Sequence, residues 1–459
     1  MTFRREHKME KKRSSFSGGI GFVLAAAGSA VGLGNLWRFP YLAAQYGGGI
    51  FILVYIILAL TFGFALLSTE IGIGRKTKQS PSTAYKMLHK KFGFVGKLAT
   101  IVPIIILPYY SVIGGWVIKY MVTFLTLQGE SAAQDSFFGG FVSNTYSPLI
   151  YFAIFLGLTA IIILLGVEKG IERISKFLMP LLLLISIVIS VYILTLPGAM
   201  EGVRYYLLPD FEKFSLKTVC AAVGQLFFSL SIAMGIIVTY GSYVKDDTNL
   251  IQSVNQIEIF DTLIALLAGF MVVPAVYIFS GEAGTKASGA GLMFITLPKV
   301  FEQMTGGAFI GALFFVLVLL AALTSSISIM EAIVSSFMDR FRLSRGKACL
   351  ICLIISVLLG VPSSLGNGAW ADIKLIGMDF LTFFDYLSNS IMMPIVALST
   401  CILVGWVLGP DLIIGEFTKN GEKMGRKRLY CVTIKYVAPI LMVIILVFYS
   451  LVQFGVITY

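Results

Sequence analysis

Small and polar residues interrupt an otherwise apolar segment near the start of the chain. Gly28, Gly32 and Gly34 leave the backbone open to a ligand, and Asn35 adds a side-chain oxygen. Carbonyl groups freed in this stretch could coordinate a cation, and freed N–H groups near Gly32–Gly34 could hold a carboxylate. The same glycine spacing is typical of a helix-packing face, so the glycines alone leave both interpretations open.

Three neighbouring hydroxyl side chains lie in a second apolar segment, at Thr324, Ser325 and Ser326. Neutral oxygens of this kind suit a hard, weakly held monovalent cation. Hydroxyl groups in membrane helices also bond their own preceding turn, so a purely local role is open as well.

Ionisable residues inside apolar segments are costly, and each therefore suggests a function. Arg38 and Asp385 lie toward the same side of the membrane in their segments and could pair as an external gate. Asp261 starts a long apolar run and could supply negative charge beside a bound cation. Glu70 could accept hydrogen bonds from an irregular neighbouring segment, in a structural role.

Enzyme chemistry finds little support in this sequence. The two histidines, His7 and His89, lie in a polar tail and a polar link, and no zinc motif or P-loop is present. We therefore expect no enzyme and no organic cofactor, which leaves transport driven by an ion gradient.

The elements that must position these residues are membrane-spanning helices. Of the 459 residues, 57% are hydrophobic and 13% charged, and the mean hydropathy is +0.90, whereas soluble domains are about a quarter charged. Apolar segments of roughly 20 residues can cross a bilayer. We predict a tail at 1–16 and one transmembrane domain at 17–456. Its eleven spans lie near residues 17–42, 48–74, 93–126, 147–166, 174–197, 217–242, 253–280, 306–338, 348–363, 378–409 and 432–456.

Positive charge falls in alternate connections between these spans. The N-terminal tail and the even-numbered links carry most of the lysines and arginines behind the net charge of +11. By the positive-inside rule, this asymmetry predicts a multi-pass protein of the cell (inner) membrane with a cytoplasmic N-terminus and a short external C-terminus. The charge thus reports topology, and we expect the lipid bilayer, and no nucleic acid, as a partner.

Breaks in the first and sixth spans, at 28–40 and 225–235, occupy similar positions in two five-span halves. Irregular backbone at membrane depth is tolerated only where it is buried in protein or lines a cavity. Such a pair points to a binding site between inverted repeats. We predict an all-α polytopic fold with unwound helices 1 and 6, repeat one near 17–197, repeat two near 217–409 and an eleventh helix near 432–456.

At these positions the sequence resembles the neurotransmitter:sodium symporter family, and within it the bacterial amino-acid transporters. Four motifs carry the resemblance, which covers nearly the whole chain, and four in the right order are highly specific. They favour a functional role for the glycines and hydroxyls. Many relatives have a twelfth helix, whereas we count eleven spans. The motifs are Gly28-Ser-Ala-Val-Gly-Leu-Gly-Asn-Leu-Trp-Arg-Phe-Pro40, Pro108-Tyr-Tyr110, Gly224-Gln-Leu-Phe-Phe-Ser-Leu-Ser231 and Leu323-Thr-Ser-Ser-Ile327.

The resemblance implies two sodium sites. In the first, the substrate carboxylate is itself a ligand, which couples ion binding to substrate binding. The ligands that the protein would give to this site are Ala30, Asn35, Ser229 and Asp261. Those of the second site would be the carbonyls of Gly28, Val31 and Ala321 and the hydroxyls of Thr324 and Ser325.

The resemblance also bears on chloride. Chloride-dependent relatives have Asn at the position of Asp261 and Ser at the position of Ala265. A built-in carboxylate would replace the anion, so we expect chloride-independent transport.

An amino-acid substrate follows from the same resemblance. Monoamine carriers have Asp where this chain has Gly32, which leaves room for a carboxylate that the Tyr110 hydroxyl would bind. Met234 replaces a bulkier aromatic residue and can repack around a ring, whereas Ala233 stands where Gly often permits large substrates. The pocket favours a neutral apolar or aromatic amino acid. Its residues would be Ser29, Ala30, Gly32, Gly34, Ile106, Tyr110, Phe228, Ser229, Ser231, Met234, Ser325 and Ile329.

Gates complete the implied mechanism. Arg38, Asp385 and Gln225, capped by Phe228, would close the outer side. The inner side would be closed by Arg13 and Asp339 with Phe16, Ser242 and Tyr243.

These features together predict sodium-coupled symport of a neutral apolar or aromatic amino acid into the cell by alternating access. The alternatives are a sodium-coupled carrier of another small zwitterion and a transporter-like amino-acid sensor, although a sensor need not retain the ion ligands. The sequence makes no prediction of oligomeric state.

Overall fold

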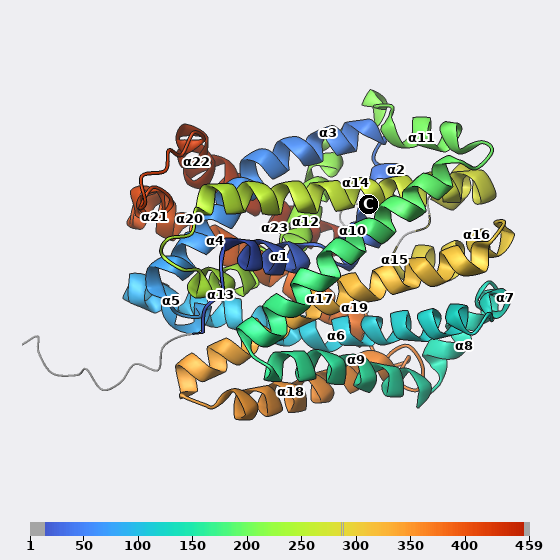
Figure 1. Cartoon of the computed structure of the whole chain (residues 1–459), viewed down its shortest axis with the longest axis horizontal. Coiled ribbons are helices and arrows are strands. Elements are labelled where there is room, and N and C mark those ends of the chain that lie inside the picture. The colour runs from blue at the N-terminus through green and yellow to red at the C-terminus, as the bar shows by residue number, and fades with distance from the viewer. Residues whose placement is uncertain (1–13, 286, 288, 454–459) are drawn as a thin grey trace, which may run out of the picture.

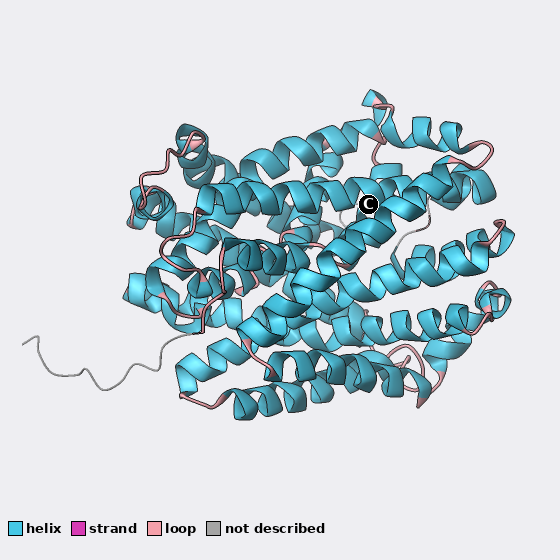
Figure 2. Cartoon of the chain, in the orientation of Figure 1, coloured by secondary structure: helices cyan, strands magenta, loops and turns pink. Residues whose placement is uncertain are grey.

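Long apolar helices make up most of the structure (Figure 1). The computed structural model describes residues 14–285, 287 and 289–453. In these residues the regular structure is helical, apart from two isolated β-bridges (Figure 2). The predicted all-α polytopic fold is confirmed.

Nine helical segments in the described part of the chain are long and apolar enough to cross a membrane. They are Gly49–Thr77 (α3, η2, α4), Lys90–Leu125 (η3, α6), Ser147–Leu164 (α9), Val167–Leu194 (η4, α10), Leu250–Thr285 (α14), Gly307–Phe341 (α17), Arg345–Leu365 (α18), Phe380–Val407 (α19 to η8) and Lys427–Val452 (α22 to α23).

The first predicted span is broken, as expected. The helical segment Gly34–Gln45 (η1 and α2) is bent by 51° away from the direction of helix α1 (Gly19–Ala30). The break begins where Val31 adopts an extended backbone with φ −77° and ψ 99°. Helix α1 packs against α10, α14 and α17, so the break lies inside the bundle (Figure 1).

The sixth predicted span is also broken, into α12 (Leu216–Ser229) and α13 (Ile236–Tyr243). Between them, Ser231, Ala233 and Gly235 have φ angles of 53°, 64° and 72°. A left-handed backbone costs a residue other than glycine about 1–2 kcal/mol. Contacts around this segment must therefore hold it in place.

Glu70 supplies one of these contacts from α4 (Phe64–Thr77). Its carboxylate oxygen Oε1 accepts a hydrogen bond from the Ala233 N–H at 2.7 Å, and both residues are buried. The predicted role of Glu70 toward an irregular neighbour is confirmed. A buried N–H without a partner would cost about 1–3 kcal/mol.

Short helices cover the two ends of the bundle (Figure 1). At one end lie α7 (Gly129–Ala132), α8 (Asp135–Ser143) and α16 (Leu297–Gln303). At the other end lie α5 (Pro81–Leu88) and α21 (Asp411–Phe417).

Candidate functional site

The two breaks and α17 meet at one place. The Ser231 hydroxyl donates to the Ser29 carbonyl at 2.9 Å, and the Ser29 hydroxyl lies 3.0 Å from the Ser231 oxygen. The Ser325 hydroxyl from α17 donates to the same Ser29 carbonyl at 3.1 Å. Backbone groups freed at the breaks thus find partners across the bundle, while space remains between the three elements.

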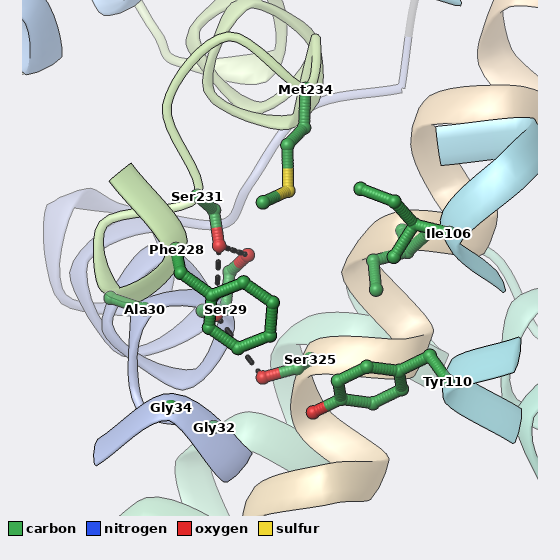
Figure 3. Close-up of a pocket in the computed structure, with 11 residues that line it drawn as sticks. Ser29, Ala30, Gly32, Gly34, Ile106, Tyr110, Phe228, Ser231, Met234 and Ser325 are labelled. Atoms are coloured by element: carbon green, nitrogen blue, oxygen red, sulfur yellow. Dashed lines mark hydrogen bonds between the residues drawn. The ribbon is translucent and has the colours of Figure 1, made fainter. Parts of the chain in front are cut away.

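That space is a small cavity (Figure 3). The structure brings eleven of the twelve predicted substrate residues to its wall, and none of the eleven has a charged side chain. The exception is Ser229, whose hydroxyl is directed to Asp261 instead. The lining residues are Ser29, Ala30, Gly32, Gly34, Ile106, Tyr110, Phe228, Ser231, Met234, Ser325 and Ile329.

The part of the cavity beside Gly32 is polar. A Cβ atom added at Gly32 would lie 2.6 Å from the Ser325 hydroxyl oxygen and 3.2 Å from the Tyr110 hydroxyl oxygen, so only glycine fits without displacement. Among the described residues, the buried Tyr110 hydroxyl forms no hydrogen bond of ordinary geometry, although the Ser325 hydroxyl and the Leu33 N–H lie close to it. Figure 3 shows this hydroxyl directed toward Ser325 and Gly32. A buried hydroxyl without a partner is costly, and a bound acceptor would remove that cost.

Next to the cavity, the buried side chains of Asn35, Tyr55 and Ser229 surround the buried Asp261 carboxylate, and these four residues are called the Asp261 cluster. Asp261 Oδ1 accepts hydrogen bonds from Asn35 Nδ2 at 2.8 Å and from the Ser229 hydroxyl at 2.5 Å. Its Oδ2 accepts one from the Tyr55 hydroxyl at 2.9 Å. The cluster holds three of the four residues expected at the first sodium site, and Ala30 lies on the adjoining cavity wall. One carboxylate among neutral oxygens is a donor set that fits a hard monovalent cation.

Tyr55 was missed by the sequence analysis. It lies in an apolar, aromatic-rich stretch of α3 (Gly49–Leu58) and reaches Asp261 from 206 residues away. The local sequence gives no signal that would distinguish it from neighbouring core aromatics.

The five residues expected at the second sodium site also lie close together. A Cβ atom at Gly28 would lie 3.3 Å from Thr324 Cβ, and the Ser325 hydroxyl lies 3.4 Å from the Val31 carbonyl oxygen. The Thr324 hydroxyl bonds the Ala321 carbonyl at 3.0 Å, in its own preceding turn. Thr324 therefore forms the hydrogen bond within its own helix that the sequence left open, whereas the Ser325 hydroxyl bonds a carbonyl of the first break.

Three of the four residues expected at the outer gate line a second, larger cavity. Arg38, Phe228 and Asp385 are part of its wall, and Phe228 also lines the first cavity, so its ring separates the two. The Arg38 guanidinium carbon lies 5.9 Å from the centre of the Phe228 ring. The Asp385 carboxylate accepts a hydrogen bond from Asn389 Nδ2 at 2.6 Å. Gln225 Nε2 donates instead to the Gly34 carbonyl, beside the first break, at 3.0 Å.

The inner-gate residues lie near the opposite end of the bundle. Asp339 accepts a hydrogen bond from the Ser80 N–H at 2.7 Å. The Phe16 ring packs edge-on against Tyr240 and Tyr243, with centroid distances of 5.7 and 6.1 Å. Arg13 lies outside the described residues.

Two features at this end were missed by the sequence analysis. The Arg345 guanidinium binds both oxygens of the buried Glu331 carboxylate at 2.6 and 2.9 Å, and the Tyr243 hydroxyl donates to it at 2.7 Å. In the exposed loop after α13, Asp246 forms salt bridges with Lys78 at 3.0 Å and with Lys419 at 3.3 Å. The hydrogen bond and positive charge of Lys78, with a smaller effect of Lys419, lower the pKa of Asp246 below its usual value.

Comparison with known sequences gives one consistent result. A model described as "Sodium:neurotransmitter symporter family" matches residues 13–133 and 143–459. A sodium-dependent transporter from Haemophilus influenzae is 34% identical over 95% of this chain and 98% of its own length. The sodium-dependent transporter YhdH from Bacillus subtilis is 34% identical over 95% and 97%, respectively. Human sodium- and chloride-dependent GABA transporter 2 is 26% identical over 91% of this chain and 77% of its own length.

Comparison with solved structures agrees. The crystal structure of MhsT in complex with L-phenylalanine matches with a TM-score of 0.86 and 34% sequence identity. The match covers 95% of this chain and 99% of that chain. The two proteins share one fold over nearly their whole lengths.

Proposed function

This chain belongs to the sodium:neurotransmitter symporter family, as a sodium-dependent transporter, and on that premise we propose that it carries a neutral apolar or aromatic amino acid into the cell together with sodium. Transport would proceed by alternating access of the cavity to the two sides of the membrane. The observation that carries this proposal is the buried Tyr110 hydroxyl beside Gly32, which forms no hydrogen bond of ordinary geometry with the described residues. It offers a hydrogen bond to an oxygen of a ligand, as a substrate carboxylate requires.

The remainder of the cavity supports an uncharged substrate side chain. Ile106, Met234 and Ile329 contribute apolar surface, and a charged side chain would find no opposite charge on the wall. MhsT, with L-phenylalanine bound in its solved structure, supports an apolar or aromatic ligand for a relative of the same fold. Met234 is flexible and could adapt to substrates of different shape.

Coupling to sodium is proposed to occur through the shared wall of the cavity and the Asp261 cluster. Ala30 would contribute to both, and Asn35 lies in the cluster five residues further along the chain. Bound sodium would supply positive charge to the substrate carboxylate, so that each ligand strengthens the binding of the other. Thr324, Ser325 and the carbonyls near Gly28 would hold a second ion that stabilises the position of α1.

Chloride is not required in this proposal. The Asp261 carboxylate already places a negative charge among Asn35, Ser229 and Tyr55, where chloride-dependent relatives have a neutral side chain. Uptake should therefore continue when gluconate replaces chloride.

Gates and orientation complete the proposal. Arg38 and Asp385 would close the outer side above Phe228, and Asp339 with Arg13 would close the inner side. The N-terminal tail and the even-numbered links carry most of the basic residues, which supports a cytoplasmic N-terminus.

A binding screen tests the proposal. The purified protein is exposed to each of the standard amino acids, with sodium or with choline, and its thermal unfolding is measured. We expect stabilisation by neutral apolar or aromatic amino acids only when sodium is present. Equal stabilisation in choline would contradict sodium coupling, and stabilisation by acidic or basic amino acids alone would contradict the assigned substrate class.

A further inference from the structure

An exposed patch of lysines and large apolar side chains lies on the link between α4 and α6. The link comprises α5 (Pro81–Leu88) and η3 (Lys90–Phe92). It lies at the end of the bundle opposite α7 and α16 (Figure 1). Helix α5 buries Pro81, Ala84 and Tyr85, and it exposes Lys86 and Met87. The exposed residues of the link and of the start of α6 are called the basic–apolar patch: Lys86, Met87, Lys90, Lys91, Phe94 and Lys97.

The four lysines of the patch differ from those just before it. Lys76 pairs with Glu416 at 3.2 Å, and Lys78 pairs with Asp246 at 3.0 Å. Among the described residues, no lysine of the patch lies within salt-bridge distance of an acidic side chain. All four are exposed, so their charges are available to a partner outside the chain.

Apolar side chains stand beside these charges. Met87 is 63% exposed and Phe94 is 50% exposed. The rings of Phe92 and Phe94 are stacked with their centres 6.3 Å apart, and Phe94 remains half-exposed. Large apolar groups interleaved with free lysines suit the boundary between lipid headgroups and acyl chains.

We propose that the basic–apolar patch binds anionic phospholipid headgroups of the cytoplasmic leaflet, with Met87 and Phe94 inserted below the phosphates. The cytoplasmic assignment rests on the orientation given under the proposed function. Four cationic groups close together complement phosphate charge, and each lysine near such a surface raises affinity about fivefold. The attraction should weaken as salt concentration rises.

Native mass spectrometry of the purified full-length protein tests this site. Phosphatidylglycerol or phosphatidylcholine is titrated into the detergent solution, and bound lipid is counted. The test variant carries glutamine at the four lysines of the patch. The matched control removes four other exposed positive charges of the predicted cytoplasmic connections. It carries Lys169→Gln, Lys347→Gln, Lys423→Gln and Arg428→Gln.

We expect the patch variant to bind phosphatidylglycerol at least about tenfold more weakly than the wild type, and the control to change less than about twofold. The apolar variant Met87→Ser/Phe94→Ser, which keeps every charge, should also lose affinity. Equal losses in the patch variant and the control, or equal binding of the two lipids by the wild type, would overturn the proposal. Thermal unfolding of each variant shows that it is folded. Bound lipid is counted without substrate or sodium, so this result can be interpreted even if the transport proposal fails.

Discussion

Replacing Asp261 with asparagine isolates the charge at the centre of the proposed sodium site. The substitution keeps the size of the side chain but replaces one acceptor oxygen with a donor. In the native protein, both carboxylate oxygens accept hydrogen bonds, from Asn35 and Ser229 on one side and from Tyr55 on the other, at 2.5–2.9 Å. At least one of these donors would lose its acceptor in the variant.

The expected effect on sodium affinity is large. A unit charge about 4 Å from a cation contributes about 4 kcal/mol at an effective dielectric constant of about 20. Water and rearranged hydrogen bonds would offset part of this loss. We therefore expect a 100- to 1,000-fold weaker sodium affinity, which corresponds to about 2.7–4.1 kcal/mol.

Scintillation proximity with labelled L-phenylalanine measures this effect as the sodium concentration that gives half-maximal binding. Asp372→Asn, at an exposed acidic residue of the loop after α18, is the matched control. A half-maximal concentration for Asp261→Asn within about threefold of the wild-type value would refute the reasoning, since about 0.7 kcal/mol cannot represent the loss of a charge beside the ion. Adding Ala265→Ser to Asp261→Asn should make binding respond to chloride, whereas the wild type should not respond.

Three further substitutions test other parts of the account. Gly32→Ala places a methyl group 2.6 Å from the Ser325 oxygen, so it should weaken substrate binding at least about tenfold. Binding is measured as competition with labelled phenylalanine. Unchanged binding would contradict the position assigned to the substrate carboxylate. Glu70→Ala should lower the free energy of unfolding by about 1–3 kcal/mol, because the Ala233 N–H loses its acceptor, whereas Glu70→Gln should retain most of the stability in the same thermal unfolding assay. The pKa of Asp246 is lowered by folding, so its stabilising effect is complete above the unfolded pKa of about 3.9 and is lost as the pH falls through the lower folded value. Asp246→Asn should therefore cost less than about 1 kcal/mol at pH 5–8, and the cost should shrink as the pH falls below the unfolded pKa. A difference that appeared only above pH 6 would contradict this assignment.

The broken spans could be predicted because local composition determines them. Glycines and polar residues within an apolar segment weaken the helix, and at membrane depth an interrupted helix is tolerated only inside the protein or beside a cavity. The structure breaks both predicted spans at these residues. The position of the candidate cavity could be predicted for the same reason. Two breaks in similar positions of two halves are expected to face each other, because their backbone groups need partners.

The partners of individual side chains could not be predicted in the same way. Tyr55 on α3 reaches Asp261 on α14 (Leu250–Thr285) over a separation of 206 residues, a contact that no local pattern encodes. Gln225 was expected to assist Arg38, but its amide donates to the Gly34 carbonyl, which also accepts the Phe39 N–H. A carbonyl oxygen has two lone pairs and can accept both hydrogen bonds. This partner depends on how α12 packs beside the first break, which no local pattern encodes.

Uptake of labelled L-phenylalanine into proteoliposomes tests the central claim most directly. The purified protein is reconstituted, and uptake is compared with an inward sodium gradient, with the gradient collapsed by a sodium ionophore, and with choline outside. We predict accumulation above the external concentration only with the sodium gradient, and its loss when the gradient is collapsed. Accumulation of equal size in choline, or sodium-dependent binding without any uptake, would contradict sodium-coupled amino-acid symport.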